Sequence, residues 1–329
     1  MGSRILPPLA AFLFLALAFS AHPANSQTDA PVYLALGDSL AFGVGADSPQ
    51  DDGYVALAAE ALRENEDEGF VGSDGLEVEN LSSPGAETAD LLEVGGQMEQ
   101  AIGIIEERAG DGVLGNEVAI ISISTGGNDL LALAEPGSPC IENAGSEACR
   151  LGLTATLTDV QNNLTEVLRQ LHEAVIASEA TAIADIFVID LYNPYSGSGE
   201  EFEIIASVGV QQLNGVIGVA VAANEAAGEI HLVRVFELFQ GRSNQWIAQD
   251  GIHPNNDGYR VMAEALLAVI EGRSVVVPED LLALPTEEPV LTVVDGDGIE
   301  PVVFWIALVV VFVAGAALST AYFGMRGRT

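Results

Sequence analysis

The chain has 329 residues and a formal net charge of -37, because 48 Asp and Glu residues stand against only 11 Lys and Arg. All of the acidic residues lie between Asp29 and Glu300, a stretch with eight arginines, and the chain contains no lysine. Phosphate groups are bound chiefly by cationic side chains, so this composition excludes nucleic acid as a partner and disfavours anionic substrates. A saline or acidic habitat would favour such a surface, and a compositional bias of the genome would produce the same pattern.

The first 26 residues have the layout of a secretory signal. Arg4 is their only charged side chain, an apolar run covers residues 9–19, and small residues end the segment at Ser26. This order predicts a signal peptide over residues 1–26 that is cleaved after Ser26. The alternative is a buried core helix, which an apolar run at the start of a chain makes the weaker interpretation.

Residues 27–273 alternate between strand-like and helix-like segments. Short apolar runs predict strands over residues 31–36, 76–81, 118–123, 183–191 and 230–236. Helical composition or periodicity predicts helices over residues 53–63, 88–108, 153–175, 203–223 and 256–271. Asn256 and Asp257 are the expected capping residues of the last helix. This alternation predicts one α/β domain with a parallel sheet that helices cover on both faces.

Cys140 and Cys149 are the only cysteines in the chain, and they stand in a segment rich in Gly, Pro and Ser that we expect to be a loop. A metal site would need further ligands nearby, and a redox pair is usually spaced C-x-x-C. Outside the cell, an isolated pair of this kind favours a structural disulfide.

Three segments follow the predicted domain. Residues 274–301 contain several prolines and acids without a clear period, which predicts a stalk. Residues 302–323 are 22 positions without a charge, long enough for a transmembrane helix. Residues 324–329 carry two arginines, which favours a short cytoplasmic tail. We therefore expect a single-pass protein of the cell membrane with its domain on the extracytoplasmic side.

Four short motifs follow four of the five predicted strands. They are Gly37-Asp38-Ser39-Leu40, Asn80-Leu81-Ser82-Ser83-Pro84-Gly85, Gly126-Gly127-Asn128-Asp129 and Asp250-Gly251-Ile252-His253-Pro254-Asn255. The carboxyl ends of parallel strands meet at one edge of the sheet, where loops from separate strands converge. We therefore expect the four motifs to form one site.

The motifs supply a nucleophile and its base. The hydroxyl of Ser39 needs a base within hydrogen-bonding reach, and His253 is the best candidate. Among the other histidines, His22 lies in the predicted signal, and His172 and His231 are expected on a helix surface and at a strand end. Asp250, three residues before His253, can accept the imidazole N–H and orient the ring.

The remaining motif residues can stabilise an oxyanion. Attack on an ester carbonyl places negative charge on its oxygen, which preorganised donors must meet. The backbone N–H of Ser39, the N–H of Gly85 and the side-chain amide of Asn128 are the candidate donors. Read only as local structure, Gly126-Gly127-Asn128-Asp129 would be a turn at the end of a strand.

In their order along residues 31–272, these motifs resemble those of the SGNH, or GDSL-type, hydrolases. The resemblance implies a three-layer α/β/α sandwich with a flavodoxin-like five-stranded parallel sheet. The residues that name the family match Ser39, Gly85, Asn128 and His253, and its partner acid matches Asp250. The elbow G-x-S-x-G is not present around Ser39, which points away from the α/β-hydrolase fold. The resemblance implies ester hydrolysis through an acyl-enzyme, without a metal or cofactor.

The substrate is less determined, because this family includes lipases, short-chain esterases, thioesterases and carbohydrate deacetylases. Phe42, Asn193, Tyr195 and Trp246 lie near the motif loops and are candidates for a substrate pocket, although simple packing explains them equally well. We expect an esterase for a neutral small-molecule, lipid or glycan ester with a short or medium acyl chain. The alternatives are a carbohydrate O-deacetylase of the same fold and a catalytically silent, surface-anchored binding domain.

Overall fold

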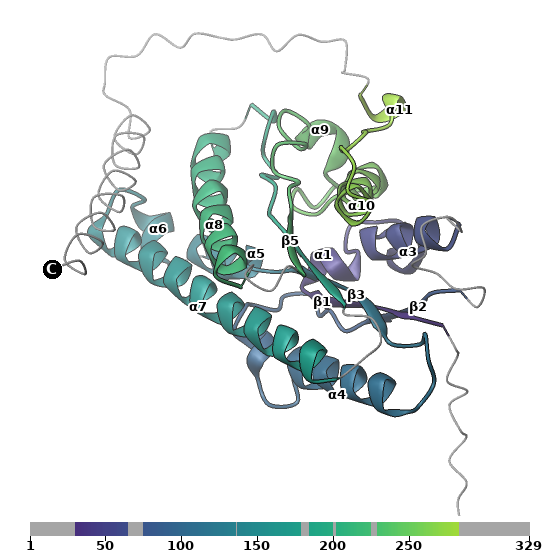
Figure 1. Ribbon diagram of the computed structural model, residues 1–329. Helices are drawn as coiled ribbons and strands as arrows, with labels where there is room; N and C mark the ends of the chain where they lie inside the picture. Colours follow the sequence, from purple (N-terminus) through teal and green to yellow (C-terminus); the bar gives the residue numbers. More distant parts are fainter. Residues whose placement is uncertain are drawn as a thin grey trace, which may run out of the picture.

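The centre of the protein is a parallel sheet of five strands in the order β2-β1-β3-β4-β5 (Figure 1). The computed structural model describes residues 30–64, 75–135, 137–178, 184–199, 202–224 and 229–282. The strands are β1 Val32–Gly37, β2 Glu77–Asn80, β3 Val118–Ser124, β4 Asp185–Ile189 and β5 Ile230–Val233. All neighbouring strands pair in parallel, which confirms the predicted α/β fold with its five-stranded sheet. The predicted signal peptide and transmembrane helix lie outside the described residues.

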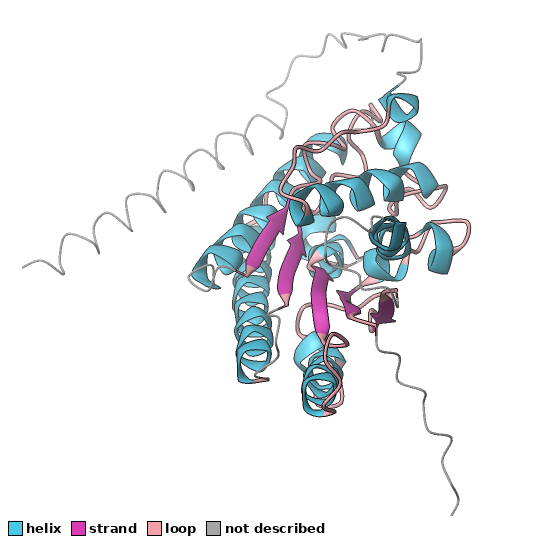
Figure 2. Ribbon diagram, turned by 45° about the vertical axis from the view of Figure 1, so that its right-hand side comes forward, coloured by secondary structure: helices cyan, strands magenta, loops and turns pink. Residues whose placement is uncertain are grey.

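Helices cover both faces of the sheet (Figure 2). Alternation along β1 divides the core, since successive side chains of a strand point to opposite faces. Tyr33 and Ala35 pack in one hydrophobic cluster, and Val32, Leu34 and Leu36 pack in the other. The first cluster includes helices α3 Tyr54–Glu64 and α10 Asn256–Ile270, and the second includes α4 Gln97–Gly110, α7 Glu147–Ala177 and α8 Phe202–Asn224. The result is a three-layer sandwich.

Within the described part of the chain, one helix is long and apolar enough to cross a membrane, over Glu203–Asn224 in α8. Its buried side chains Leu213, Ile217 and Val221 pack in the second hydrophobic cluster, together with the side chains of Val32, Leu34 and Leu36. We interpret α8 as a layer of the sandwich, because core helices share this length and composition.

The predicted helix over residues 88–108 is two helices. A 3-10 helix, η1 Asp90–Leu92, ends where Glu93 is extended, and α4 starts only at Gln97. Gly95 between them has a positive φ of 77°, which an α-helix does not contain. The apolar spacing continues across this turn, so periodicity alone did not indicate the break.

The cap of α10 also differs from the prediction. Asn255 is the N-cap, and its side chain accepts a hydrogen bond from the N–H of Gly258. The side chain of Asn256 instead accepts the N–H of Asp47 across the protein. Asp257 lies in the first turn of the helix.

Residues 274–282, the start of the predicted stalk, lie against the domain. They include the short helix α11 Glu279–Leu282, whose Leu281 is 5% exposed. Arg260 on α10 forms an ion pair with Asp280 at 3.0 Å. The apolar side chains in this segment therefore extend the folded domain to residue 282.

Short helices that the sequence did not indicate lie in the connections between strands and in the segments after β5. They are α1 Ser39–Phe42, α2 Pro49–Asp52, α5 Gly127–Leu131, η2 Ala132–Ala134, α6 Pro139–Glu142, α9 Ser243–Trp246 and the α11 helix described above. Helices of this length show too few turns to produce a recognisable apolar period.

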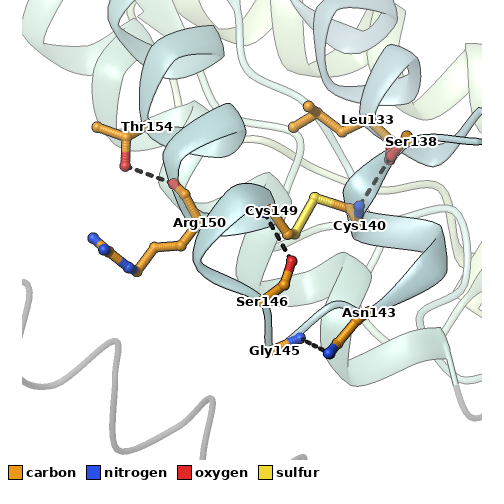
Figure 3. The surroundings of a disulfide bond; sticks show 9 residues. All are labelled: Leu133, Ser138, Cys140, Asn143, Gly145, Ser146, Cys149, Arg150 and Thr154. Carbon is orange, nitrogen blue, oxygen red and sulfur yellow. Dashed lines mark hydrogen bonds between the residues drawn. A yellow bond between two sulfur atoms is a disulfide. The ribbon is translucent and has the colours of Figure 1, made fainter.

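The predicted disulfide between Cys140 and Cys149 is present, with the two Cα atoms 4.6 Å apart (Figure 3). The surrounding segment, expected to be a loop, contains α6 and the first turn of α7. Ser138 caps α6 by accepting the N–H of Cys140, and Ser146 caps α7 by accepting the N–H of Cys149. The disulfide thus joins the first turns of two capped helices.

Candidate active site

Ser39 is the first residue of α1, and a single residue, Asp38, separates it from the end of β1. The turn between them is possible because Gly37 has a φ of 125° and contacts β3 closely. A Cβ atom on Gly37 would lie 1.9 Å from the carbonyl oxygen of Ser124, so no larger residue fits there. Asp38 then caps α1 by accepting the N–H of Leu40 at 3.0 Å. This turn presents Ser39 at the carboxyl edge of the sheet.

Three side chains form a continuous hydrogen-bonded chain at this edge. Ser39 Oγ lies 2.8 Å from His253 Nε2, and His253 Nδ1 lies 2.7 Å from Asp250 Oδ2. An ionised carboxylate can only accept, so Nδ1 carries the proton of a neutral imidazole and Nε2 is left to accept from Ser39. This geometry allows His253 to remove the proton of the Ser39 hydroxyl.

Asp250 is held in its charged form. Partial burial by itself would raise the pKa of Asp250, but hydrogen bonds from the N–H groups of Ile252 and His253 and from the His253 ring lower it overall. A carboxylate that stays ionised can stabilise the imidazolium that forms when His253 takes a proton.

The loop that carries His253 is fixed on several sides. The Tyr192 hydroxyl donates to the carbonyl of Ile252 at 2.7 Å, and the N–H of Ala248 donates to the carbonyl of His253 at 2.8 Å. Gly45 packs so closely that a Cβ on it would lie 2.5 Å from the carbonyl oxygen of Pro254. The position of the imidazole is therefore set by contacts with the chain on both sides of the loop.

Side chains of the motif Gly126-Gly127-Asn128-Asp129 form hydrogen bonds with the loop that follows Gly85. The Asn128 side-chain amide donates to the carbonyl of Ala86 at 2.9 Å. The carboxylate of Asp129 accepts the N–H and the hydroxyl of Thr88, at 3.0 and 2.7 Å. Gly85, next to Ala86, is exposed and has a positive φ of 86°. Asn128 and Asp129 thus fix the loop that carries the N–H of Gly85, and Asn128 keeps a second amide N–H for another acceptor.

Asp38, next to Ser39 in the chain, is buried. Burial raises the pKa of Asp38 to about 7, and the nearby negative charge of Asp129 adds to the rise, while the N–H of Leu40 opposes it. Near neutral pH this carboxyl is therefore protonated in a large part of the molecules, which keeps a full negative charge away from Ser39.

Gln97 is a site residue that the sequence did not indicate. Its side-chain oxygen accepts the N–H of Gly37 at 2.7 Å, and its amide donates to the carbonyl of Gly37 at 2.8 Å. Gln97 is the first residue of α4 and 7% exposed. The sequence alone shows only a glutamine within a predicted helical segment. Its partner Gly37 lies 60 positions away, so nothing in the sequence indicates the contact.

A cavity of about 450 Å³ opens beside Ser39 and His253. Of the four predicted pocket residues, Tyr195 lines this cavity. Asn193 is 1% exposed; it accepts the N–H of Tyr195 and donates to the carbonyl of Glu203, so it shapes the chain before α8. Trp246 is buried in the core, and Phe42 is 39% exposed on α1; neither lines the cavity.

The other described histidines lie away from Ser39. His172 on α7 pairs with Glu229 at 3.1 Å, and His231 on β5 pairs with Asp185 at 3.1 Å. Among the described histidines, His253 is the one that contacts Ser39.

Residues 35–261 match the model of the GDSL-like lipase/acylhydrolase family, and this match contains all four motifs. The chain belongs to this family. The resemblance predicted from the motifs is therefore confirmed, and the protein is an ester-bond hydrolase.

Two GDSL relatives span most of the chain. The spore germination lipase LipC of Bacillus licheniformis is 26% identical over 248 residues, which cover 73% of this chain and 97% of LipC. The structure of the lipase Lip_vut3 from a goat rumen metagenome is 25% identical and has a TM-score of 0.53, covering 72% of this chain and 96% of that lipase. The similarity thus extends over nearly the whole length of both relatives.

The raised pKa of Asp38 predicts a pH-dependent stability. The folded state holds this proton more tightly than the unfolded chain, so the contribution of Asp38 to stability is present below about pH 4 and is lost as the pH rises to about 7. Asp38→Asn does not show this loss. Relative to wild type, the free energy of unfolding of the variant should therefore rise between about pH 4 and about pH 7, on the order of 1.4 kcal/mol per unit of pKa shift. Urea unfolding at several pH values measures the difference. Asp159→Asn, at an exposed position on α7, is the control. An Asp38→Asn curve parallel to that of wild type would contradict the prediction.

The contacts of Gln97 predict a positioning role. Gln97→Leu leaves the N–H of Gly37 without its acceptor, which we expect to lower the free energy of unfolding by about 1–3 kcal/mol. Because Gly37 sets the direction of Ser39, kcat should fall while KM changes little. Gln100→Leu, on the exposed side of the same helix, is the matched control. Steady-state kinetics at a temperature where both variants are folded provide the test; an unchanged kcat in Gln97→Leu would leave Gln97 with a structural role alone.

Proposed function

We propose that this GDSL hydrolase cleaves neutral carboxylic esters through an acyl-enzyme on Ser39. The observation that carries the proposal is the chain of hydrogen bonds from Ser39 through His253 to Asp250, at 2.8 and 2.7 Å. Nucleophile, base and orienting carboxylate stand in the arrangement that serine hydrolases use on unrelated folds.

The first half of the reaction forms the acyl-enzyme. His253 Nε2 takes the proton of Ser39 as Oγ bonds to the ester carbonyl carbon and the carbonyl electron pair moves onto oxygen. When this intermediate collapses, the bond to the alcohol oxygen breaks and the leaving alkoxide takes the proton from His253. The alcohol departs, and the acyl group stays on Ser39.

Water then completes the cycle. His253 takes a proton from water as the water oxygen attacks the acyl carbon, and the collapse returns that proton to Ser39 Oγ. The carboxylic acid is released and the enzyme is regenerated.

The oxyanion in both steps needs donors near Ser39. Ser39 is the first residue of α1, where a backbone N–H has no acceptor within the helix. We assign the other two donors to the N–H of Gly85 and the second amide N–H of Asn128. The bond from Asn128 to the carbonyl of Ala86 supports this assignment, because it orients the amide and places the Gly85 loop next to it.

The proposal predicts the effects of three substitutions on hydrolysis of p-nitrophenyl esters. Ser39→Ala and His253→Ala should each lower kcat by about 10⁶-fold, the scale found for serine-protease triads. Asp250→Asn should lower it by about 10⁴-fold, because it favours the wrong imidazole tautomer. His172→Ala, at a histidine of α7 that pairs with Glu229 and does not line the cavity, serves as the control. A folded Ser39→Ala variant with wild-type rates would rule out the acyl-enzyme.

We also propose that the enzyme acts outside the cytoplasm, held to the cell membrane by residues 302–323. Support comes from the apolar runs over residues 9–19 and 302–323 and from the disulfide, because disulfides persist mainly in oxidising compartments.

This location predicts where the esterase activity is found in a bacterial host. The full chain should stay with membranes after alkaline extraction, because a transmembrane helix inserts almost irreversibly. A chain that stops after Leu282 should release the activity into the soluble extracytoplasmic fraction. Activity of the full chain in the cytoplasmic fraction would exclude the proposed location.

A further inference from the structure

Three groups of helices form the walls of the cavity beside Ser39. One wall comes from α5 and η2, a second from α6 and the start of α7, and a third from the start of α8. Apolar side chains dominate these walls: Leu130, Leu133, Ile141, Leu153, Ile204 and Val208. The volume of about 450 Å³ is within the range of pockets that enclose small organic ligands.

Polar groups line the cavity at its catalytic end and at α6, where Glu142 and Asn143 are lining residues. Ser39, Asn128 and His253 line the catalytic end, next to the buried Asp38. Neither arginine nor lysine is among the lining residues, so the walls offer an anionic group no cationic partner. The walls away from Ser39 thus suit a hydrocarbon better than a charged ligand.

Large apolar side chains at the cavity remain exposed. Leu131, Ile141, Ile204 and Ile205 all line the cavity and are 41%, 48%, 48% and 36% exposed. Isolated apolar residues on a surface are common, but a group of four around one cavity marks a site for an apolar ligand. A hydrocarbon chain in the cavity would cover part of this surface.

The disulfide makes the second wall one rigid unit. Both Cys140 and Cys149 line the cavity, and their bond ties α6 to α7 (Figure 3). The hydroxyl of Ser138, the cap of α6, donates to the carbonyl of Leu133 in η2. The wall segments from η2 to α7 are therefore connected by a covalent bond and a hydrogen bond.

We propose that this cavity binds the acyl chain of the ester, so that the substrates are esters of medium-length fatty acids, such as octanoyl esters, rather than acetylated sugars. The proposal rests on the serine esterase mechanism above. The disulfide-bonded wall determines chain-length preference, because it holds Ile141 and Leu153 against the chain. Each methylene that the cavity buries should raise kcat/KM by up to about fourfold.

Gly209 on α8 offers a way to fill the cavity without disturbing the catalytic residues. It lines the cavity, and a Cβ on it would lie 3.5 Å from Leu130 Cδ2, an ordinary contact distance. Gly209→Leu therefore places a side chain into the acyl site from the α8 wall. The matched control is Gly215→Leu on the same helix, at an exposed position where a Cβ meets no atom within 4 Å.

The test compares kcat/KM for p-nitrophenyl acetate, butyrate, octanoate and laurate. Wild type should favour octanoate over acetate by about tenfold or more, since several methylenes enter the cavity. Gly209→Leu should lose about tenfold on octanoate and stay within about twofold on acetate, because only the longer chain meets the new side chain. Gly215→Leu should follow wild type. A preference for acetate in wild type, or equal losses on both esters in Gly209→Leu, would overturn the acyl-site proposal while leaving the serine esterase in place.

A binding measurement separates this proposal from the mechanism. If no ester is hydrolysed, the proposed function fails, and calorimetric titration of wild type with monooctanoylglycerol below its micellar concentration still tests the cavity. Binding that Gly209→Leu weakens and Gly215→Leu does not would support an acyl site. Absence of binding would overturn it.

Removal of the disulfide tests whether the wall formed by α6 and α7 determines the chain-length preference. Cys140 and Cys149 are the only cysteines, so Cys140→Ser with Cys149→Ser alters nothing else. Octanoate turnover should fall several-fold while acetate turnover is retained, in a variant whose circular dichroism spectrum is that of the folded protein. An unchanged chain-length profile would remove the disulfide from the determination of specificity.

Discussion

The close contact between Gly37 on β1 and the carbonyl of Ser124 on β3 is the constraint on which the site depends. With a Cβ only 1.9 Å from that oxygen, no side chain fits, so the strand can turn at once into α1 and present Ser39 at the sheet edge. Gln97, at the start of α4, binds both the backbone N–H and the backbone carbonyl of Gly37. Ser39, the proposed nucleophile, is thus positioned by backbone packing and by a buried glutamine, independently of its contact with His253.

A second constraint is the burial of carboxyl groups at this edge in a protein already rich in negative charge. Burial raises the pKa of Asp38 to about 7, so near neutral pH only about half of the molecules carry a negative charge next to Ser39. Asp250 is kept ionised by N–H donors, as a partner of an imidazolium must be. Asp129 is used as an acceptor for Thr88. Three aspartates in one site therefore have three separate functions, set by their different hydrogen-bond partners and burial.

The sequence was sufficient for the sheet and for the motif residues, and it failed where tertiary contacts decide. Buried parallel strands are short apolar runs, and Ser39, His253 and Asp250 carry chemistry that their types and order reveal. Gln97 could not be found, because its role exists only through its contact with Gly37, 60 positions away in the chain. Trp246 was a reasonable pocket candidate beside a motif, yet it is buried in the core. The cavity walls were also missed, since short helices without a periodic pattern build part of them.

The combination of an apolar cavity and an acidic surface has a consequence for the proposed reaction. A neutral ester meets no electrostatic repulsion when it approaches a chain with a net charge of -37. Hydrolysis, however, converts its acyl group into a negatively charged carboxylate. That product stands in a cavity whose lining includes Glu142 and no cationic residue apart from His253 in its protonated form. Hydrocarbon contacts that hold the substrate are then opposed, in the product, by repulsion between like charges. The negative charge that disfavours anionic substrates therefore also favours release of the acid product, and salt weakens this effect by screening.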